Sequence, residues 1–249
     1  MSRSNTRKAT IKERRRQRQR EERRNMLLIG GGVILVILAI IIVPTIYKAL
    51  TPAAPVGDFK RITPVAYPNE NGTSLGDPNA PVKIDTWEDF QCPSCQQYSD
   101  NVEPQVIEAY VKTGKVYYTF HQYPFIDTNT TTKESHQAAN ASMCAAEQGL
   151  FWNYRNILFA NWQGENQGYL ADNRLVAFAD SLGLDMTKFN ACFKANKYSS
   201  QIEADFTRGQ QMGVQGTPSV FVNGIIVTPG YIPQFKDIQA AVDAALAGK

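Results

Sequence analysis

The sequence has 249 residues, of which 43% are hydrophobic and 20% are charged, and its formal net charge is +3. Such a chain can hold one substantial packed domain, which excludes disorder over the whole length. The charge is uneven: residues 1–25 contain eleven Lys and Arg against three acids, a net +8, so the rest of the chain carries −5. The basic character therefore belongs to the first segment alone.

An uncharged apolar segment follows the basic one directly. Residues 26–43 read MLLIGGGVILVILAIIIV, and residues 44–47 extend this apolar character. Since about 20 apolar residues cross a bilayer core as a helix, we predict a transmembrane helix over residues 26–47. The positive-inside rule then places the basic segment 1–25 in the cytoplasm. The sequence thus predicts a single-pass protein of the cell membrane with an extracytoplasmic domain.

Two other interpretations of this N-terminal region are weaker. A cleaved signal peptide has a shorter apolar region, of roughly 7–15 residues, and a small-residue cleavage site. The nearest small residues here, Ala53 and Ala54, are followed by Pro55, which makes a poor site. Binding of nucleic acid by the arginines is the other alternative, but their position beside an apolar span favours a role in membrane topology.

Residues 48–74 are rich in proline and contain an Asn-Gly pair at positions 71–72. Proline fixes φ and lacks an N–H, so it discourages both helix and sheet. We therefore expect a semi-rigid linker over residues 48–74 and a folded domain over residues 75–249.

The folded part begins with the pattern strand, helix, strand. Alternation of apolar and polar residues predicts a strand over residues 82–87, and a helical period predicts a helix from Ser94 that ends at Gly114. Aromatic residues closed by Pro124 predict a second strand over residues 116–123. We interpret this order as a βαβ unit.

A long helical region comes next, from about residue 130 to residue 212. Its aromatic side chains, Trp162 among them, have helical spacing, which favours a place in the core over a place in a binding groove. The pair Asn223-Gly224 between two short apolar runs predicts a β-hairpin, and an apolar pattern over residues 233–247 predicts a last helix. The expected fold class is therefore α/β with an all-helical insertion.

Two of the four cysteines, Cys92 and Cys95, lie where the first strand gives way to the helix. A structural zinc site needs four ligands, and the chain offers one such pair and two histidines, His121 and His136, without a suitable spacing. We therefore expect no metal. A structural disulfide is a second alternative, but a bridge across two intervening residues removes little entropy from the unfolded chain.

A reactive pair explains this position better. The unpaired N–H groups and the dipole at a helix N-terminus favour an anion, so we expect Cys92 to ionise well below the free-thiol pKa of about 8.5. Cys95, one turn further along the helix, is sheltered and is placed to attack a mixed disulfide formed on Cys92. Pro93 and Ser94 lie between them and help to tune the chemistry, and Ser94 can donate a hydrogen bond to the thiolate.

Four stretches between residues 76 and 224 carry a family resemblance: GDPNAPVKI, DFQCPSC, CAAEQGLFW and GVQGTPSVFVNG. In this order they resemble DsbA-like thiol-disulfide oxidoreductases of the thioredoxin superfamily, of the membrane-anchored bacterial type. The resemblance implies a thioredoxin fold interrupted by a helical domain, with Cys92 as nucleophile and Cys95 as resolving cysteine. It also implies that Thr217 and a cis Pro218 face the two cysteines, where the Thr217 backbone pairs with an extended substrate chain.

One position departs from the family pattern. A buried acid commonly lies six residues before the first cysteine, where it assists proton transfer from the inner cysteine, and this chain has Thr86 there. Asp85 lies on the opposite face of the strand by alternation. Glu88 and Asp89 are close in sequence, and their ordinary interpretation is that of solvated loop charges. Whether either of them replaces the missing acid is an open question at this stage.

The other two cysteines, Cys144 and Cys192, lie in the helical region. Relatives of this type often have a second disulfide there, so the resemblance implies a structural bridge between the two. A pair of buried free thiols is the alternative. On the chain-entropy model, a bridge that closes a loop of this length stabilises the fold by about 3–4 kcal/mol.

The resulting hypothesis is an oxidase that introduces disulfides into reduced, unfolded proteins after translocation, without a cofactor. The resemblance implies reoxidation by a quinone-linked membrane partner, DsbB-like or vitamin K epoxide reductase-like. Pro93-Ser94 lacks the histidine of the strongest oxidants, so we expect a less extreme oxidant. Two alternatives stay open: a disulfide reductase or isomerase on the same scaffold, and a non-catalytic thioredoxin-like binding module.

Overall fold

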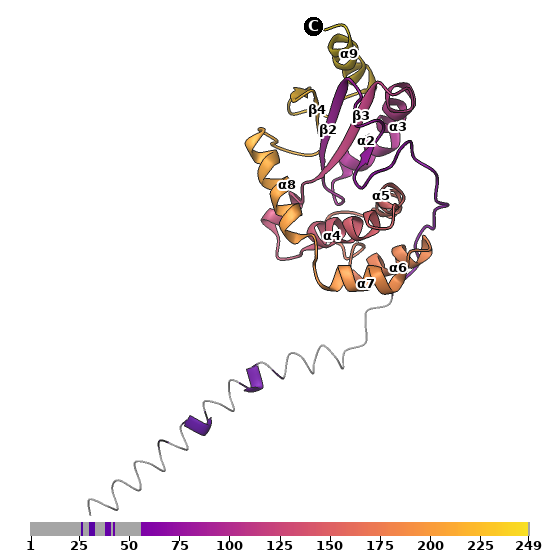
Figure 1. The fold of residues 1–249 in the computed structure, drawn as a ribbon. Helices are drawn as coiled ribbons and strands as arrows, with labels where there is room; N and C mark the ends of the chain where they lie inside the picture. The colour runs from indigo at the N-terminus through magenta and orange to yellow at the C-terminus, as the bar shows by residue number, and fades with distance from the viewer. Residues whose placement is uncertain (1–25, 27–29, 33–37, 41, 43–55, 249) are drawn as a thin grey trace, which may run out of the picture. The chain divides into compact units, whose positions relative to one another are not determined.

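The computed structural model describes residues 26, 30–32, 38–40, 42 and 56–248 (Figure 1). The basic segment 1–25 lies outside the described residues, and so does most of the predicted transmembrane segment 26–47. Within the part of the chain that is described, no helix is both long and apolar enough to span a membrane. Residues 56–248 belong to one folded unit.

A five-stranded sheet in the order β1-β3-β2-β4-β5 forms the centre of this unit. β2 and β3 run parallel, and the other neighbouring pairs are antiparallel. The strands are β1 (Ser74–Leu75), β2 (Val82–Glu88), β3 (Val116–Gln122), β4 (Ser219–Val222) and β5 (Ile225–Val227). The predicted βαβ unit corresponds to β2, the helices after it and β3.

The hairpin predicted near the C-terminus is confirmed. Asn223 and Gly224 connect β4 to β5 with φ angles of 48° and 80°. A two-residue turn of type I′ requires left-handed backbone at both positions, which Asn and Gly adopt at low cost. β1, by contrast, has no sequence signal: it is two residues long and pairs with Tyr118 and Thr119 of β3.

The helix expected from Ser94 to Gly114 is not continuous. α2 (Pro93–Asn101) and α3 (Glu103–Val106) are followed by a π-helical turn, η1 (Ile107–Val111). Pro104 explains the break, because it has no N–H to donate to the carbonyl four residues earlier and its ring crowds that carbonyl. The prediction of a single helix is therefore wrong.

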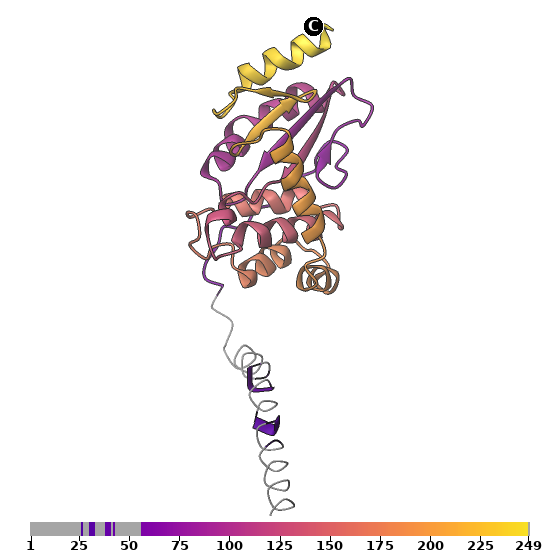
Figure 2. The same ribbon diagram turned by 90° about the vertical axis from the view of Figure 1, so that its left-hand side faces the viewer.

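Most of the remaining helices lie beyond one end of the sheet. The full set of remaining helices is η2 (Ile126–Asn129), α4 (Glu134–Ala146), α5 (Phe151–Ala160), α6 (Asp172–Ser181), α7 (Met186–Lys194), α8 (Ser199–Gln211) and α9 (Phe235–Leu246). Figures 1 and 2 show α4 to α7 gathered at that end, α8 leading back to the strands, and α9 on the opposite side. We call α4 to α8 the helical insertion.

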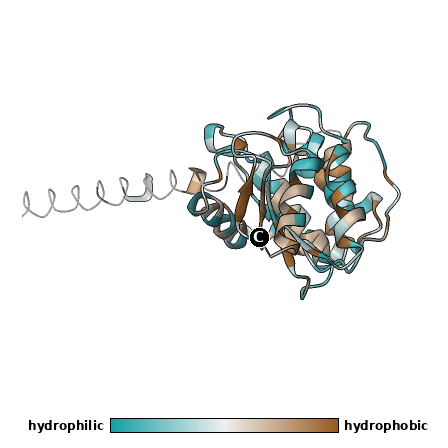
Figure 3. Ribbon diagram, turned by 90° about the horizontal axis from the view of Figure 1, so that it is seen from above, coloured by the Kyte–Doolittle hydropathy of each residue, from teal (hydrophilic) through white to brown (hydrophobic). Residues whose placement is uncertain are grey.

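Alternation along the strands gives the sheet two different faces. Val82 and Ile84 of β2 belong to the large apolar core, which also includes residues of α9. Trp87, on the other face of β2, packs with Phe221 of β4 and with Phe206 of α8. Figure 3 shows brown, hydrophobic strand residues in the interior and teal residues mostly on the outer helices and loops. The sheet is therefore covered by apolar contacts on both faces.

The aromatic side chains of the helical insertion pack into the same large apolar core as the strands. Trp152 of α5 is fully buried there, whereas Trp162, which the sequence places in the core, is only partly buried. Cys144 of α4 and Cys192 of α7 are joined by a disulfide with 5.8 Å between their Cα atoms. The bridge therefore connects two helices that are far apart in the sequence.

Residues 56–68, which fall in the predicted linker, lie against the helical insertion instead. Asn153 of α5 and Asn161, the residue just after α5, are almost fully buried, and each side-chain amide pairs with the backbone of one residue in this segment. Asn153 accepts from the Val65 N–H at 2.8 Å and donates to the Val65 carbonyl at 3.0 Å. Asn161 pairs with Lys60 in the same way, at 2.7 and 2.9 Å. We call residues 56–68 the strap.

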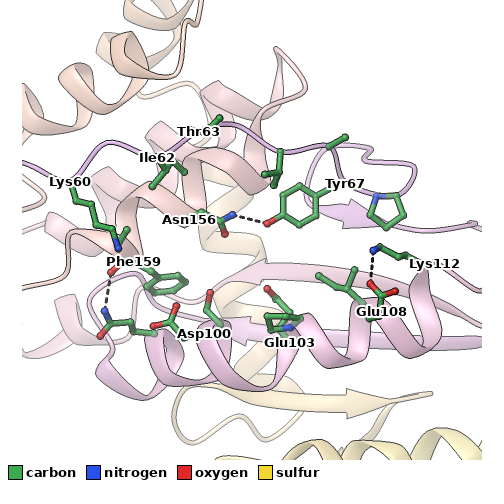
Figure 4. Close-up of a pocket in the computed structure, with 18 residues that line it drawn as sticks. Lys60, Ile62, Thr63, Tyr67, Asp100, Glu103, Glu108, Lys112, Asn156 and Phe159 are labelled. Carbon is green, nitrogen blue, oxygen red and sulfur yellow. Dashed lines mark hydrogen bonds and ion pairs between the residues drawn. The ribbon is translucent and has the colours of Figure 1, made fainter.

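The strap covers a cavity of about 580 Å³ that is also lined by residues of α2, α3 and α5 (Figure 4). Asn156 of α5 donates to the hydroxyl of Tyr67 in the strap at 2.6 Å. Apolar side chains and the charged groups of Asp100, Glu103, Glu108 and Lys112 also contribute to the lining. The folded domain therefore begins before residue 75, because the buried amides of Asn153 and Asn161 take the place of a neighbouring strand for the proline-containing strap.

Candidate active site

Cys92 lies at the junction of β2 and α2. Residues 89–92 form a turn closed by a hydrogen bond of 3.0 Å from the Cys92 N–H to the Asp89 carbonyl. Cys92 then occupies the N-cap of α2 with extended backbone, φ −76° and ψ 121°. Pro93 takes the first helical position, where a missing N–H is harmless because that group has no partner within the helix. The turn thus brings the Cys92 sulfur to the first amides of α2.

The loop before β4 faces this sulfur. The Thr217–Pro218 peptide bond is cis, and the Cys92 Sγ lies 3.2 Å from the Thr217 carbonyl oxygen. Although 125 positions separate Cys92 from Thr217 in the sequence, the pairing of β2 with β4 brings them together. The structure therefore gathers Cys92, Cys95, Thr217 and Pro218 in one place.

The surroundings of Cys92 favour its thiolate. The Cys95 thiol, as a hydrogen-bond donor to the Cys92 sulfur, is the main cause that lowers the pKa of Cys92 to about 6, against the opposing effect of burial. The N–H groups of Cys95 and Ser94 lower it further. Ser94 thus acts through its backbone, whereas the sequence suggested its hydroxyl.

Cys95 has the opposite character. It is fully buried, and burial raises the pKa of its thiol well above the ordinary value, with further contributions from Cys92 and from the charge of Glu88. Near neutral pH the structure therefore supports one thiolate and one thiol. Such an unequal pair suits thiol-disulfide exchange, because Cys92, at 9% exposed the more accessible of the two residues, reacts with other chains as a thiolate while the fully buried Cys95 thiol keeps its proton.

Glu88 and Asp89 are not solvated loop charges. Glu88 is 0% exposed and Asp89 is 1% exposed, so the expectation from the sequence is wrong. Burial raises the pKa of Glu88 to about 8 and that of Asp89 to about 7. Alternation along β2 also puts Glu88 on the same face as Thr86, two residues away. That period is the signal that could have identified Glu88 as a buried acid beside the cysteines.

Glu88 shares one cation with a second buried carboxylate, Glu103. Arg155 of α5 contacts both Glu103 oxygens, at 2.7 and 2.9 Å, and lies 3.6 Å from Glu88. Neither oxygen of Glu88 has a hydrogen-bond partner. One guanidinium balances one carboxylate, so the less well bonded acid holds a proton more readily. Glu88 is therefore a buried acid that holds its proton readily, and its charge raises the pKa of Cys95.

A groove beside the Thr217–Pro218 loop has room for a polypeptide segment. Its volume is about 450 Å³, and its lining includes Ser94, Pro218, Ile226 and Tyr231. Tyr231 is 80% exposed and adds an aromatic surface to this groove. The mixture of apolar side chains and accessible backbone suits an extended chain.

The two histidines lie away from this site. His121 of β3 is on the α8 face of the sheet, where its ring nitrogens lie 2.7 Å from Asp85 and 3.4 Å from Asp205. His136 belongs to α4 and lines a different cavity. Among the residues that the structure describes, no group of three or more His, Cys, Asp and Glu side chains could hold a metal ion.

Comparisons with known proteins agree with this chemistry. The profile of a family described as Thioredoxin matches residues 68–244. Probable disulfide bond formation protein D of Bacillus cereus is 27% identical over 175 residues, which cover 70% of this chain and 78% of that protein.

Two solved structures share the fold. BdbD from Bacillus subtilis, in its oxidised form, has a TM-score of 0.63 and 22% identity over 76% of this chain and 99% of that one. The alpha-DsbA1 of Wolbachia pipientis has a TM-score of 0.61 and 25% identity over 73% and 94%. The predicted thioredoxin fold with inserted helices is thereby confirmed.

Fold and site together define a thiol-disulfide oxidoreductase. The chain belongs to the thioredoxin family, and within it to the DsbA-like proteins.

Proposed function

We propose that this oxidoreductase works as an oxidase, which introduces disulfide bonds into reduced, unfolded proteins. The observation that carries the proposal is the unequal pair: the pKa of Cys92 is lowered to about 6, whereas that of Cys95 is raised. A stabilised thiolate favours the reduced form of the Cys92–Cys95 couple, and a couple that favours its reduced form gives its disulfide away readily.

The reaction uses two substrate thiolates. The first attacks the Cys92 sulfur of the Cys92–Cys95 disulfide, a mixed disulfide forms, and Cys95 leaves as a thiolate that takes up a proton. The second attacks the substrate sulfur of the mixed disulfide, so that Cys92 leaves as a thiolate. The substrate loses two electrons and the cysteine pair gains two. We assign the supply of this proton to Glu88, a buried acid whose charge acts on Cys95.

The setting of this reaction is also part of the proposal. We place residues 1–25 in the cytoplasm, the helix 26–47 in the membrane and the folded domain outside, where disulfides persist. The apolar segment and the arginines before it support this topology. A quinone-linked membrane protein, DsbB-like or vitamin K epoxide reductase-like, would then return the cysteine pair to the disulfide.

The test is the oxidation of a reduced, unfolded protein by the purified oxidised enzyme, followed by counting the remaining substrate thiols. We expect loss of two substrate thiols per enzyme disulfide. Cys92→Ser is the control, and with this variant the substrate thiols should be oxidised only as fast as in buffer without enzyme. An oxidised enzyme that is no faster than this variant would refute the proposal, and a pair found mainly reduced in cells would favour a reductase or isomerase.

A further inference from the structure

The turn before Cys92 is buried, so its backbone needs hydrogen-bond partners. Phe90 and Gln91 are the two central residues of the turn 89–92, and they are 1% and 0% exposed. The carbonyls of central turn residues have no partner within the turn, and a buried carbonyl without one is costly. Their partners must therefore come from another part of the chain.

Both carbonyls are bound by the loop between α5 and α6, residues 161–171, which we call the clamp loop. Trp162 donates its indole N–H to the Gln91 carbonyl at 2.6 Å, and Tyr169 donates its hydroxyl to the Phe90 carbonyl at 3.4 Å. The two rings contact each other edge to face, with 6.5 Å between their centroids. One loop of the helical insertion thus holds two successive peptide groups.

The Gln91 side chain adds to this attachment. Its oxygen accepts from the N–H of Asn166 in the clamp loop at 2.7 Å, and its nitrogen donates to Ser135 Oγ of α4 at 2.9 Å. The Gln91 N–H donates to Asp89 at 2.8 Å, and Ser135 Oγ also donates to Asp89, at 2.6 Å. Every polar atom of Gln91 therefore has a partner, and most of these partners belong to the helical insertion.

We propose that Trp162 and Tyr169 are positioning residues, which hold the turn before Cys92 so that its sulfur faces the amides at the start of α2. The plane of the peptide between Gln91 and Cys92 decides where the Cys92 side chain points, and Trp162 fixes that plane through its carbonyl. The helical insertion then controls the chemistry of the cysteine. This inference rests on the proposed function, because it concerns the same thiolate.

The test is the acidity of Cys92 in the full chain, measured as the rate of its alkylation by iodoacetamide against pH. Trp162→Phe keeps an aromatic ring and removes the N–H donor. We expect Cys92 in this variant to bind its proton about 3- to 10-fold more tightly, the range that one hydrogen bond supports. Tyr169→Phe should raise the proton affinity of Cys92 by a smaller factor, because the hydrogen bond from Tyr169 to the Phe90 carbonyl is the longer of the two.

Tyr154→Phe is the matched control. Its hydroxyl donates to the Leu175 carbonyl at 2.8 Å within the helical insertion and does not touch residues 90–92. We expect this variant to unfold at a lower temperature while Cys92 keeps the acidity of the unmodified protein. A shift as large as that in Trp162→Phe would show that general loosening of the insertion is the cause, and would overturn the positioning role.

An unchanged acidity of Cys92 in a folded Trp162→Phe protein would also overturn the positioning role of Trp162. If Trp162→Phe does not fold, Tyr169→Phe decides the question, because it removes only a hydroxyl. A protein of natural sequence whose Cys92 ionises like a free thiol would instead contradict the proposed function. The two failures are therefore distinguishable.

Discussion

Cys144 and Cys192 join α4 to α7 across a sequence separation of 48, inside the helical insertion. Cys92 and Cys95 lie within one turn of α2, where amides and a neighbouring thiol stabilise one sulfur as an anion and burial keeps the other protonated. The first pair closes a long loop and can therefore stabilise the fold. The second closes almost none, and its surroundings give it reactivity instead.

The two cysteine pairs consist of the same residue type, so their different roles, one structural and one reactive, come from where each pair lies along the chain and from the groups around it. A helix N-terminus supplies unpaired N–H groups that a cysteine further along the helix does not meet. Cys144 and Cys192 lie in the last turns of α4 and α7, at the opposite end from those N–H groups. The variants below test this separation in order of expected effect.

The largest effect is expected from the reactive pair. Cys92→Ser should abolish oxidation of a reduced substrate, because the attacked sulfur is gone. Cys95→Ser should also stop turnover, but it should leave a mixed disulfide between Cys92 and the substrate, which non-reducing electrophoresis detects. Equal accumulation of mixed disulfide in both variants would contradict the assigned roles.

Replacing Cys144 and Cys192 together by alanine should act on stability alone. We expect the free energy of unfolding to fall by about 3–4 kcal/mol on the chain-entropy model, measured by denaturant titration. The acidity of Cys92 should stay the same in the folded variant. A change in that acidity would mean that the two pairs are coupled through the helical insertion.

The pH dependence of stability should distinguish the reduced from the oxidised protein. The folded chain ionises Cys92 above pH about 6, whereas its ordinary pKa is 9.0, so between these values the unfolded state binds more protons. The reduced protein should therefore gain stability relative to the oxidised one as pH rises through this window, and lose that gain as pH falls through 6. Thermal unfolding of both forms at several pH values measures the difference, and parallel curves would contradict it.

Glu88→Gln should have a smaller, pH-dependent effect. The pKa of Glu88 is raised from 4.5 to about 8 by burial, so the unfolded state releases this proton first and the natural protein loses stability as pH rises between these values. Glutamine does not titrate, so the variant should become more stable relative to the natural protein over the same range. A constant difference across this range, measured by chemical denaturation, would show that Glu88 ionises normally.

Local signals in the sequence were sufficient for much of the fold and for the reactive cysteines. Asn223-Gly224 predicts its hairpin because few other pairs accept left-handed backbone twice. Strand alternation, with the step from Cys92 to Pro93 that begins α2, places the cysteine pair at a helix N-terminus. Pro104 was also a local signal, because proline interrupts a helix, but a prediction from helical periodicity alone did not take it into account.

The remaining features depend on contacts between distant parts of the chain. The strap looks like a linker because its partners, Asn153 and Asn161, lie about 90 to 100 residues further on. In the sequence, Trp162 is one more aromatic residue of a helical region. No local pattern around residue 91 or residue 162 predicts the hydrogen bond from its indole to the Gln91 carbonyl. Such contacts come from packing, which single-residue patterns do not encode.

The reduction potential of the Cys92–Cys95 couple tests the oxidase proposal most directly. The purified protein is equilibrated in glutathione buffers, and the fraction reduced is read by mass after alkylation of free thiols. Because the Cys92 thiolate is stabilised, we predict a value near or above that of protein disulfide isomerase, about −180 mV. A value near that of thioredoxin, about −270 mV, would contradict it, because such a couple keeps its disulfide.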